Sequence, residues 1–116
     1  MYRKAEERET EIRHEMKGGK GDVKIIHSFS DAELDSPARL CAEIDIEPGC
    51  SIGTHIHENE EEIFYIIEGT AKANDNGNDV ILTAGDSLLT GGGRCHGIEN
   101  IGEKTLRLFA AVIRFS

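Results

Sequence analysis

The stretch GTHIHENEEEIFYIIEG (residues 53–69) begins with histidines and carboxylates and ends as an apolar strand. His55 and His57 stand one residue apart, and four acidic residues follow within five positions. On a β-strand both imidazole rings leave the same face and can reach one point. Glu62 follows after a short turn, so a returning strand could bring its carboxylate to that point. The stretch therefore predicts either a cation site or a charged turn that precedes a strand.

Period-two alternation continues on both sides of this stretch. In LCAEIDIEPG (residues 40–49) apolar and polar side chains alternate, and Pro48-Gly49 ends the run with a turn. Asn76-Gly77 is a hairpin signal. Further strands are predicted over residues 23–29, 53–57, 62–69, 69–73, 78–86, 94–100 and 105–115. This many short strands, separated by frequent turns, predicts an all-β sandwich or barrel.

The composition limits the functions that this chain can have. Its 116 residues, 38% of them hydrophobic, can build one modest core. The 22 acidic and 13 basic residues give a net charge of -9, which repels phosphate backbones and anionic lipid. We find no signal peptide and no run of roughly 18 apolar residues that could span a membrane. Three cysteines without a C-x-x-C pair fit a reducing compartment. We expect a cytoplasmic protein that binds neither nucleic acid nor membrane.

The first 22 residues differ from the rest in composition. Alanine, glutamate, arginine and lysine dominate residues 1–17, so propensity favours a helix there. GGKGD (residues 18–22) is predicted to be a flexible turn. The expected organisation is a charged N-terminal arm over residues 1–22 and a single β-domain over residues 23–116.

A second histidine segment, GGGRCHGIEN (residues 91–100), offers a further ligand, His96. This histidine would share its strand face with Arg94, Ile98 and Asn100. Three imidazoles and one carboxylate would suit a divalent ion of manganese, iron, nickel, copper or zinc. Spacing alone does not separate a metal site from ordinary surface structure. An H-x-H pair in a β-protein more often lies on the surface, or is hydrogen-bonded and partly buried, than binds a metal. A run such as ENEEE is usually a solvated turn.

Together the two segments resemble the two motifs of the cupin superfamily. The first motif runs Gly, five residues, His, one residue, His, three or four residues, Glu, six residues, Gly. Its positions here are Gly49, His55, His57, Glu62 and Gly69. The second motif runs Gly, five residues, Pro, one residue, Gly, two residues, His, three residues, Asn. Gly85, Gly93, His96 and Asn100 match it, whereas Gly91 replaces the proline. The resemblance spans residues 38–112.

The resemblance implies a cupin jelly-roll β-barrel, or double-stranded β-helix, over residues 23–116. Two antiparallel sheets would enclose one divalent transition metal held by His55, His57, Glu62 and His96. An octahedral ion with these four ligands would keep two positions for water or substrate. The other carboxylates of ENEEE are expected to form a solvated turn. Ala42, Leu108 and Ala110 are the inward neighbours expected from strand parity, and they would leave a small, largely apolar cavity around the ion.

The cupin fold hosts several activities and does not choose among them. Our leading hypothesis is a metal-dependent isomerase or lyase for a sugar- or acid-like metabolite. The alternatives are a non-catalytic module that binds metal and a small ligand, and a metal-dependent dioxygenase. Arg94 is the candidate for binding a carboxylate or phosphate of the ligand, with Lys20 as a weaker one. We assign no catalytic residue, so enzyme status stays open.

The strand that follows Glu62 bears on the oligomeric state. Ile63, Tyr65 and Ile67 alternate away from the inward face, and exposing them together would be unfavourable. We expect a homodimer that buries this patch, and the resemblance suggests that residues 10–13 cross to the partner. The alternative is that the arm covers the patch within one chain.

Overall fold

Strands dominate the structure, as the period-two pattern predicted. The computed structural model describes residues 1–115, and this range contains ten strands and three short 3-10 helices. The strands are β1 (Glu9–His14), β2 (Asp22–Phe29), β3 (Ala38–Ile46), β4 (Ser51–Ile56), β5 (Glu60–Glu68), β6 (Thr70–Asp75), β7 (Asn78–Thr83), β8 (Ser87–Gly91), β9 (Cys95–Asn100) and β10 (Leu106–Arg114). The helices are η1 (Ala5–Glu7), η2 (Met16–Gly18) and η3 (Asp31–Glu33). Within residues 1–115 no helix has the length and apolarity needed to cross a membrane.

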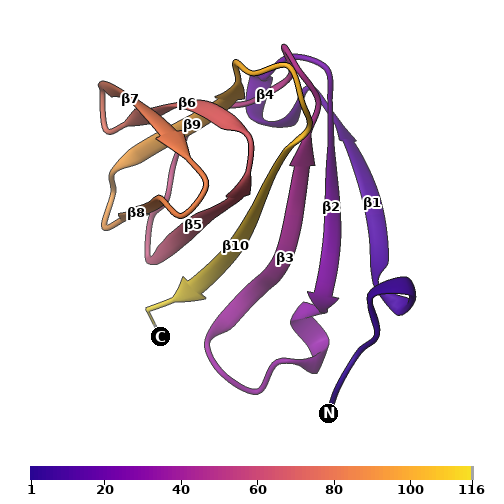
Figure 1. The fold of residues 1–116 in the computed structure, drawn as a ribbon. Coiled ribbons are helices and arrows are strands. Elements are labelled where there is room, and N and C mark those ends of the chain that lie inside the picture. The colour runs from indigo at the N-terminus through magenta and orange to yellow at the C-terminus, as the bar shows by residue number, and fades with distance from the viewer. Residues whose placement is uncertain (116) are drawn as a thin grey trace.

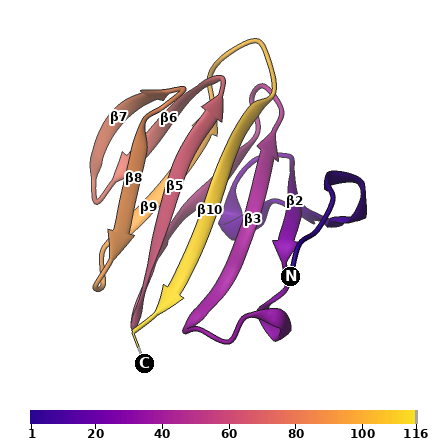
Figure 2. The ribbon, with the colours of Figure 1, turned by 60° about the horizontal axis from the view of Figure 1, so that its bottom comes forward.

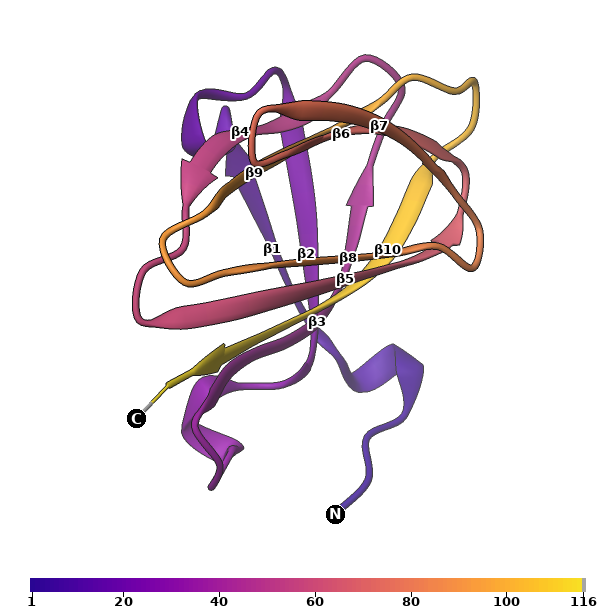
Figure 3. The same cartoon turned by 90° about the vertical axis from the view of Figure 1, so that its left-hand side faces the viewer.

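Two antiparallel sheets face each other (Figure 1). The larger has the order β1-β2-β3-β10-β5-β8, and the smaller has the order β4-β9-β6-β7. Figure 2 shows strands of the larger sheet side by side, and Figure 3 shows the smaller sheet above β5 and β8 of the larger one. Successive strands such as β3, β4 and β5 alternate between the sheets, as a jelly roll requires. The predicted all-β jelly-roll fold is therefore confirmed.

The core lies between the sheets and is built largely from alternate residues of the strands β2 to β10. Phe64 and Ile66 of β5 are at most 1% exposed, as are Leu106, Leu108, Ala110 and Val112 of the neighbouring β10. Burying a side chain the size of Phe64 or Ile66 contributes about 1.5–3 kcal/mol. Ala42, Leu108 and Ala110 are fully buried, as strand parity predicted.

Residues 9–14 form a strand instead of the helix that their composition favours. This strand, β1, pairs with β2 of the same chain from Glu9 opposite His27 to His14 opposite Asp22. A short isolated helix is marginal in water, whereas the edge of β2 offers a ladder of backbone hydrogen bonds. Because β1 lies four strands away from β5, the arm does not cover the predicted patch. Tyr65 remains 46% exposed.

Two glycines near the histidine strands are required for different reasons. Asn76 and Gly77 both have positive φ, 50° and 97°, which is the type I′ hairpin that this dipeptide predicts. Gly91 stands where the cupin motif has proline. A Cβ atom there would lie 2.6 Å from the Cβ of Glu61 and 2.8 Å from the carbonyl oxygen of Glu60. The close approach of β8 to β5 therefore excludes a side chain at residue 91.

Candidate metal centre

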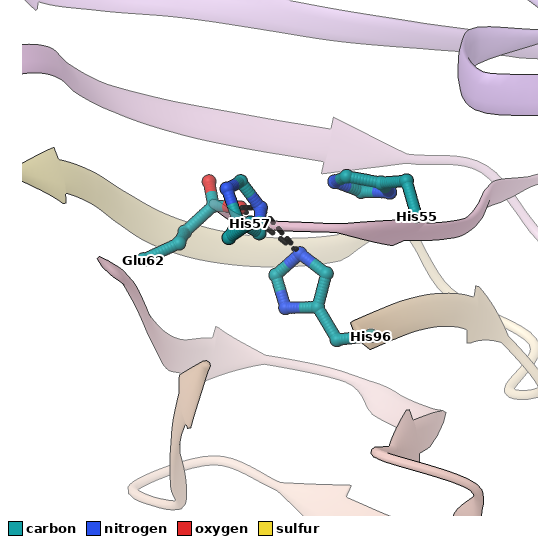
Figure 4. A group of neighbouring side chains, drawn as sticks. All are labelled: His55, His57, Glu62 and His96. Carbon is teal, nitrogen blue, oxygen red and sulfur yellow. Dashed lines mark hydrogen bonds and ion pairs between the residues drawn. The ribbon is translucent and has the colours of Figure 1, made fainter. Parts of the chain in front are cut away.

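Four side chains converge between the two sheets (Figure 4). His55 lies on β4, His57 directly follows that strand, Glu62 lies on β5 and His96 lies on β9. Their potential ligand atoms all lie within 4.8 Å of one another. His55 is partly buried, and the other three side chains are buried. The structure thus brings together the four residues predicted from the sequence, in a cluster able to hold a metal ion.

Strand pairing and one unusual backbone conformation create this convergence. His55 lies opposite His96 in the pairing of β4 with β9. The chain reverses after His57 through Asn59, whose φ of 59° is in the left-handed region that asparagine tolerates well. This reversal starts β5 and returns Glu62 to the histidines. The three ring centroids end 4.7–4.9 Å apart.

Each imidazole is held by the protein through its Nδ1 atom. The pairs are His55 with the carbonyl oxygen of Gly53 (2.7 Å), His57 with a carboxylate oxygen of Glu60 (2.6 Å) and His96 with Oγ1 of Thr90 (3.0 Å). The Gly53 and Glu60 oxygens can only accept, so the first two Nδ1 atoms donate. Hydrogen bonds of this kind fix ring orientation and leave Nε2 free to bind a metal.

The atoms that face one another at the centre are lone-pair donors. Nε2 of His57 lies 3.1 Å from Nε2 of His96, and these atoms lie 2.9 and 3.0 Å from Oε1 of Glu62. Lone pairs at such separations repel, so the cluster needs a cation, either a proton or a metal ion. Bonds of about 2.1 Å at right angles around one ion place neighbouring donor atoms about 3.0 Å apart. The spacing and chemistry of these donors therefore fit a divalent ion.

The charge states expected for these groups suit a metal. Burial acts to raise the pKa of Glu62, but hydrogen bonds from His57 and His96 bring it below the ordinary glutamate value. The carboxylate therefore stays ionised at neutral pH. Burial lowers the pKa of His55 and keeps this imidazole neutral. The hydrogen bond to Glu62 raises the pKa of His57, so a metal would compete with a proton there.

Glu60 is a site residue that the sequence analysis assigned wrongly to a solvated turn. Only 16% of its side chain is exposed. Besides the hydrogen bond from His57, its carboxylate accepts hydrogen bonds from Nε and Nη2 of Arg39 at 2.8 and 2.7 Å. The hydrogen bond from Arg39 lowers the pKa of Glu60 to about 2. A signal was present in the sequence, because Glu60 and Glu62 are two residues apart on one strand and share its face.

A small cavity of about 20 Å³ lies beside the cluster. This is room for about one water molecule. Its polar lining comes from His55, Glu62 and Arg13. The rest of its lining is apolar and consists of Met16, Ile25, Leu40, Ile44, Ile52 and Phe64. The predicted small, largely apolar cavity is thus present, with an arginine that the sequence analysis did not assign to it.

The two basic residues proposed from the sequence lie elsewhere. Arg94 is exposed in the turn before β9 and is not among the described residues that line the small cavity. Its backbone carbonyl accepts a hydrogen bond from the backbone N–H of His57 (3.1 Å). Lys20 lines a separate hollow of about 320 Å³ that contains none of the four clustered side chains.

Known proteins resemble this chain in sequence and in structure. The profile of the cupin domain family matches residues 42–112. An oxalate-binding protein of Thermotoga maritima is 44% identical over 98 residues, which are 84% of this chain and 81% of that protein. The crystal structure of a predicted oxalate decarboxylase from Thermotoga maritima has a TM-score of 0.93 at 40% identity and covers 98% of this chain and 99% of that one. The polyketide cyclase RemF from Streptomyces resistomycificus shares the fold at 20% identity, with a TM-score of 0.79 over 100% of this chain and 80% of that one.

Proposed function

The chain belongs to the cupin family, and from this premise we propose that it binds a small carboxylic acid such as oxalate at a metal centre. The metal would be one divalent transition ion held by His55, His57, Glu62 and His96. Such an ion supplies a Lewis acid for the oxygen atoms of the ligand. The fit of three imidazole nitrogens and one carboxylate supports ions from manganese to zinc without choosing among them.

The observation that carries this proposal is the cluster of four donor side chains, which lies beside a small cavity. The cavity volume of about 20 Å³ has room for about one water molecule, so a sugar or sugar phosphate is disfavoured and even a two-carbon acid would have to displace a lining side chain such as the partly exposed Arg13. The apolar walls exclude water and strengthen polar interactions at the ligand's oxygen atoms. The relative named for oxalate binding supports a two-carbon acid as the first ligand to test.

Binding without turnover is the form of the proposal that the cavity supports best. An enzyme would need an acid or base beside the ligand in addition to the metal-holding groups. Among the described residues lining the cavity, the ionisable ones are His55, Glu62 and Arg13. His55 and Glu62 would bind the metal. Arg13 is a poor proton donor because arginine stays charged. Lyase chemistry, favoured by the neighbour described as a predicted oxalate decarboxylase, is the second candidate.

The metal is tested first, by elemental analysis of the purified protein. We expect about one divalent ion per chain in the wild type and little in His96→Ala, which loses one of the clustered nitrogen donors. His14→Ala is the matched control, because His14 is exposed and lies on β1 outside the cluster. Equal metal content in all three proteins would contradict the proposed site. Circular dichroism confirms that each variant is folded.

The ligand is tested next, by calorimetric titration of oxalate into metal-loaded and chelator-treated protein. We expect oxalate to bind only the metal-loaded protein, and Glu62→Gln to lose both metal and oxalate. A sugar phosphate is expected not to bind. Assaying the same samples for carbon dioxide and formate separates the candidates, since both products would indicate a lyase. Absence of oxalate binding in the loaded protein would overturn the proposal.

A further inference from the structure

We propose that Arg13 recognises a second anionic group of the ligand and so makes the site selective for small dianions. The inference rests on the proposed function, because it concerns the same cavity. It assigns a specificity-determining role to the N-terminal strand. In this arrangement the ligand lies between the histidine cluster and a guanidinium group.

The pairing of β1 with β2 sets the direction of Arg13. This residue lies opposite Val23, which is fully buried in the core. Directly opposite residues in an antiparallel pair project on the same face of the sheet. Arg13 therefore lies on the inner face of the six-stranded sheet, although β1 is an edge strand. Consistent with this, it lines the cavity together with His55 and Glu62.

The charge of Arg13 is needed at this place. The chain carries a net charge of -9, and the cavity already contains the carboxylate of Glu62. The divalent ion would attract one end of a dianion, but the carboxylate at the other end would be repelled unless positive charge lies beside it. Of the described residues that line the cavity, Arg13 is the one with a permanent positive charge. Its planar guanidinium can bind a carboxylate through two parallel hydrogen bonds.

Arg13 can exchange its present partner for a ligand. Its Nε and Nη2 atoms donate to the Glu11 carboxylate at 3.2 and 3.0 Å, and 43% of each side chain is exposed. An ion pair this exposed contributes little to stability, so giving it up costs little. Glu11 would keep a second partner, because Nε2 of His27 lies 2.8 Å from its Oε1 atom.

The size of the cavity limits the ligand to a few atoms. Its volume of about 20 Å³ lies between the cluster and Arg13, so both ends of the ligand must be close together. Two carboxylates joined directly need the least additional space, which Arg13 can provide by leaving Glu11, whereas a longer diacid would also have to displace the apolar walls. A two-carbon acid with a single carboxylate would reach the cluster but would leave Arg13 without an anionic partner.

The experiment compares two arginine variants and two ligands in metal-loaded protein by calorimetry. Arg13→Gln is expected to weaken oxalate binding about 10- to 100-fold, the range for a lost hydrogen bond to a charged group. Glycolate, which has one carboxylate, is expected to bind Arg13→Gln within about threefold of the wild type. Arg94→Gln is the control and is expected to bind oxalate like the wild type. Metal content is measured in each variant and is expected to be unchanged.

The outcomes separate this inference from the proposed function. Wild-type oxalate affinity in Arg13→Gln would overturn the role of Arg13 and leave the metal-dependent binding of oxalate standing. Loss of oxalate binding in Arg94→Gln alone would transfer the role to Arg94. Failure of the loaded wild type to bind oxalate would overturn both. If Arg13→Gln proves misfolded, Arg13→Lys is used. Lysine keeps the positive charge but lacks the planar guanidinium group that binds a carboxylate through two hydrogen bonds. An oxalate affinity equal to that of the wild type would count against the inference.

Discussion

Asp45 should make the protein less stable as the pH rises from acid to neutral. This residue lies on β3, and its Oδ1 atom is buried and has no hydrogen-bond partner among residues 1–115. Burial, and then the neighbouring Glu43, raise the pKa of Asp45 to about 7. Glu43 retains its charge because Arg107 and Arg8 donate to its carboxylate, and its pKa falls to about 2 despite burial. The folded protein therefore holds a proton on Asp45.

The direction and size of this change in stability follow from the difference in proton binding between the folded and unfolded states. The folded protein binds this proton more tightly than the unfolded chain, whose Asp45 has the ordinary pKa of 3.8. The free energy of unfolding therefore falls between pH 4 and pH 7. The interval from 3.8 to about 7 corresponds to about 4 kcal/mol at 1.36 kcal/mol per pH unit. Solvent around the partly exposed carboxyl reduces this to about 2 kcal/mol.

Asp45→Asn tests this reasoning, because asparagine is neutral at every pH and its amide can still donate to Glu43. Urea unfolding is measured from pH 4 to pH 8.5 with chelator present and at one protein concentration. We expect the variant to match the wild type within about 0.5 kcal/mol at pH 4 and to exceed it by about 2 kcal/mol at pH 8.5. Asp79→Asn is the control, because 66% of the Asp79 side chain is exposed. A constant difference between Asp45→Asn and wild type across this pH range would refute the argument.

Two further predictions concern the metal centre and the surface. Glu60→Gln is expected to weaken metal binding about tenfold, because a neutral amide orients His57 less firmly. Chelator competition measures this, and Glu58→Gln at an exposed neighbouring position is the control; equal affinities of the two variants would contradict it. We also propose that the protein is a homodimer that buries Tyr65 and Ile67 on the outer face of the larger sheet. Light scattering is expected to give the mass of two chains and a lower mass for Tyr65→Glu, whereas a single-chain mass for the wild type at micromolar concentration would rule the dimer out.

The sequence alone was sufficient for the all-β fold and for the four residues of the cluster. Side-chain direction on a strand depends only on whether a position is odd or even, so alternation predicted that His55 and His57 share a face. The intervals of the two cupin motifs then added Glu62 and His96. The same local parity correctly placed Ala42 in the core.

The tertiary structure decided which residues surround the cluster. Composition favoured a helix over residues 1–17, and pairing with β2 overrode this preference and directed Arg13 towards the cavity. Sequence proximity to His96 had instead suggested Arg94, which is exposed. In the sequence Glu60 could not be distinguished from the neighbouring glutamates. Its hydrogen bonds with Arg39 in the structure identify it. Local geometry sets the face of a strand on which a side chain lies, but only the pairing of distant strands determines what that side chain meets.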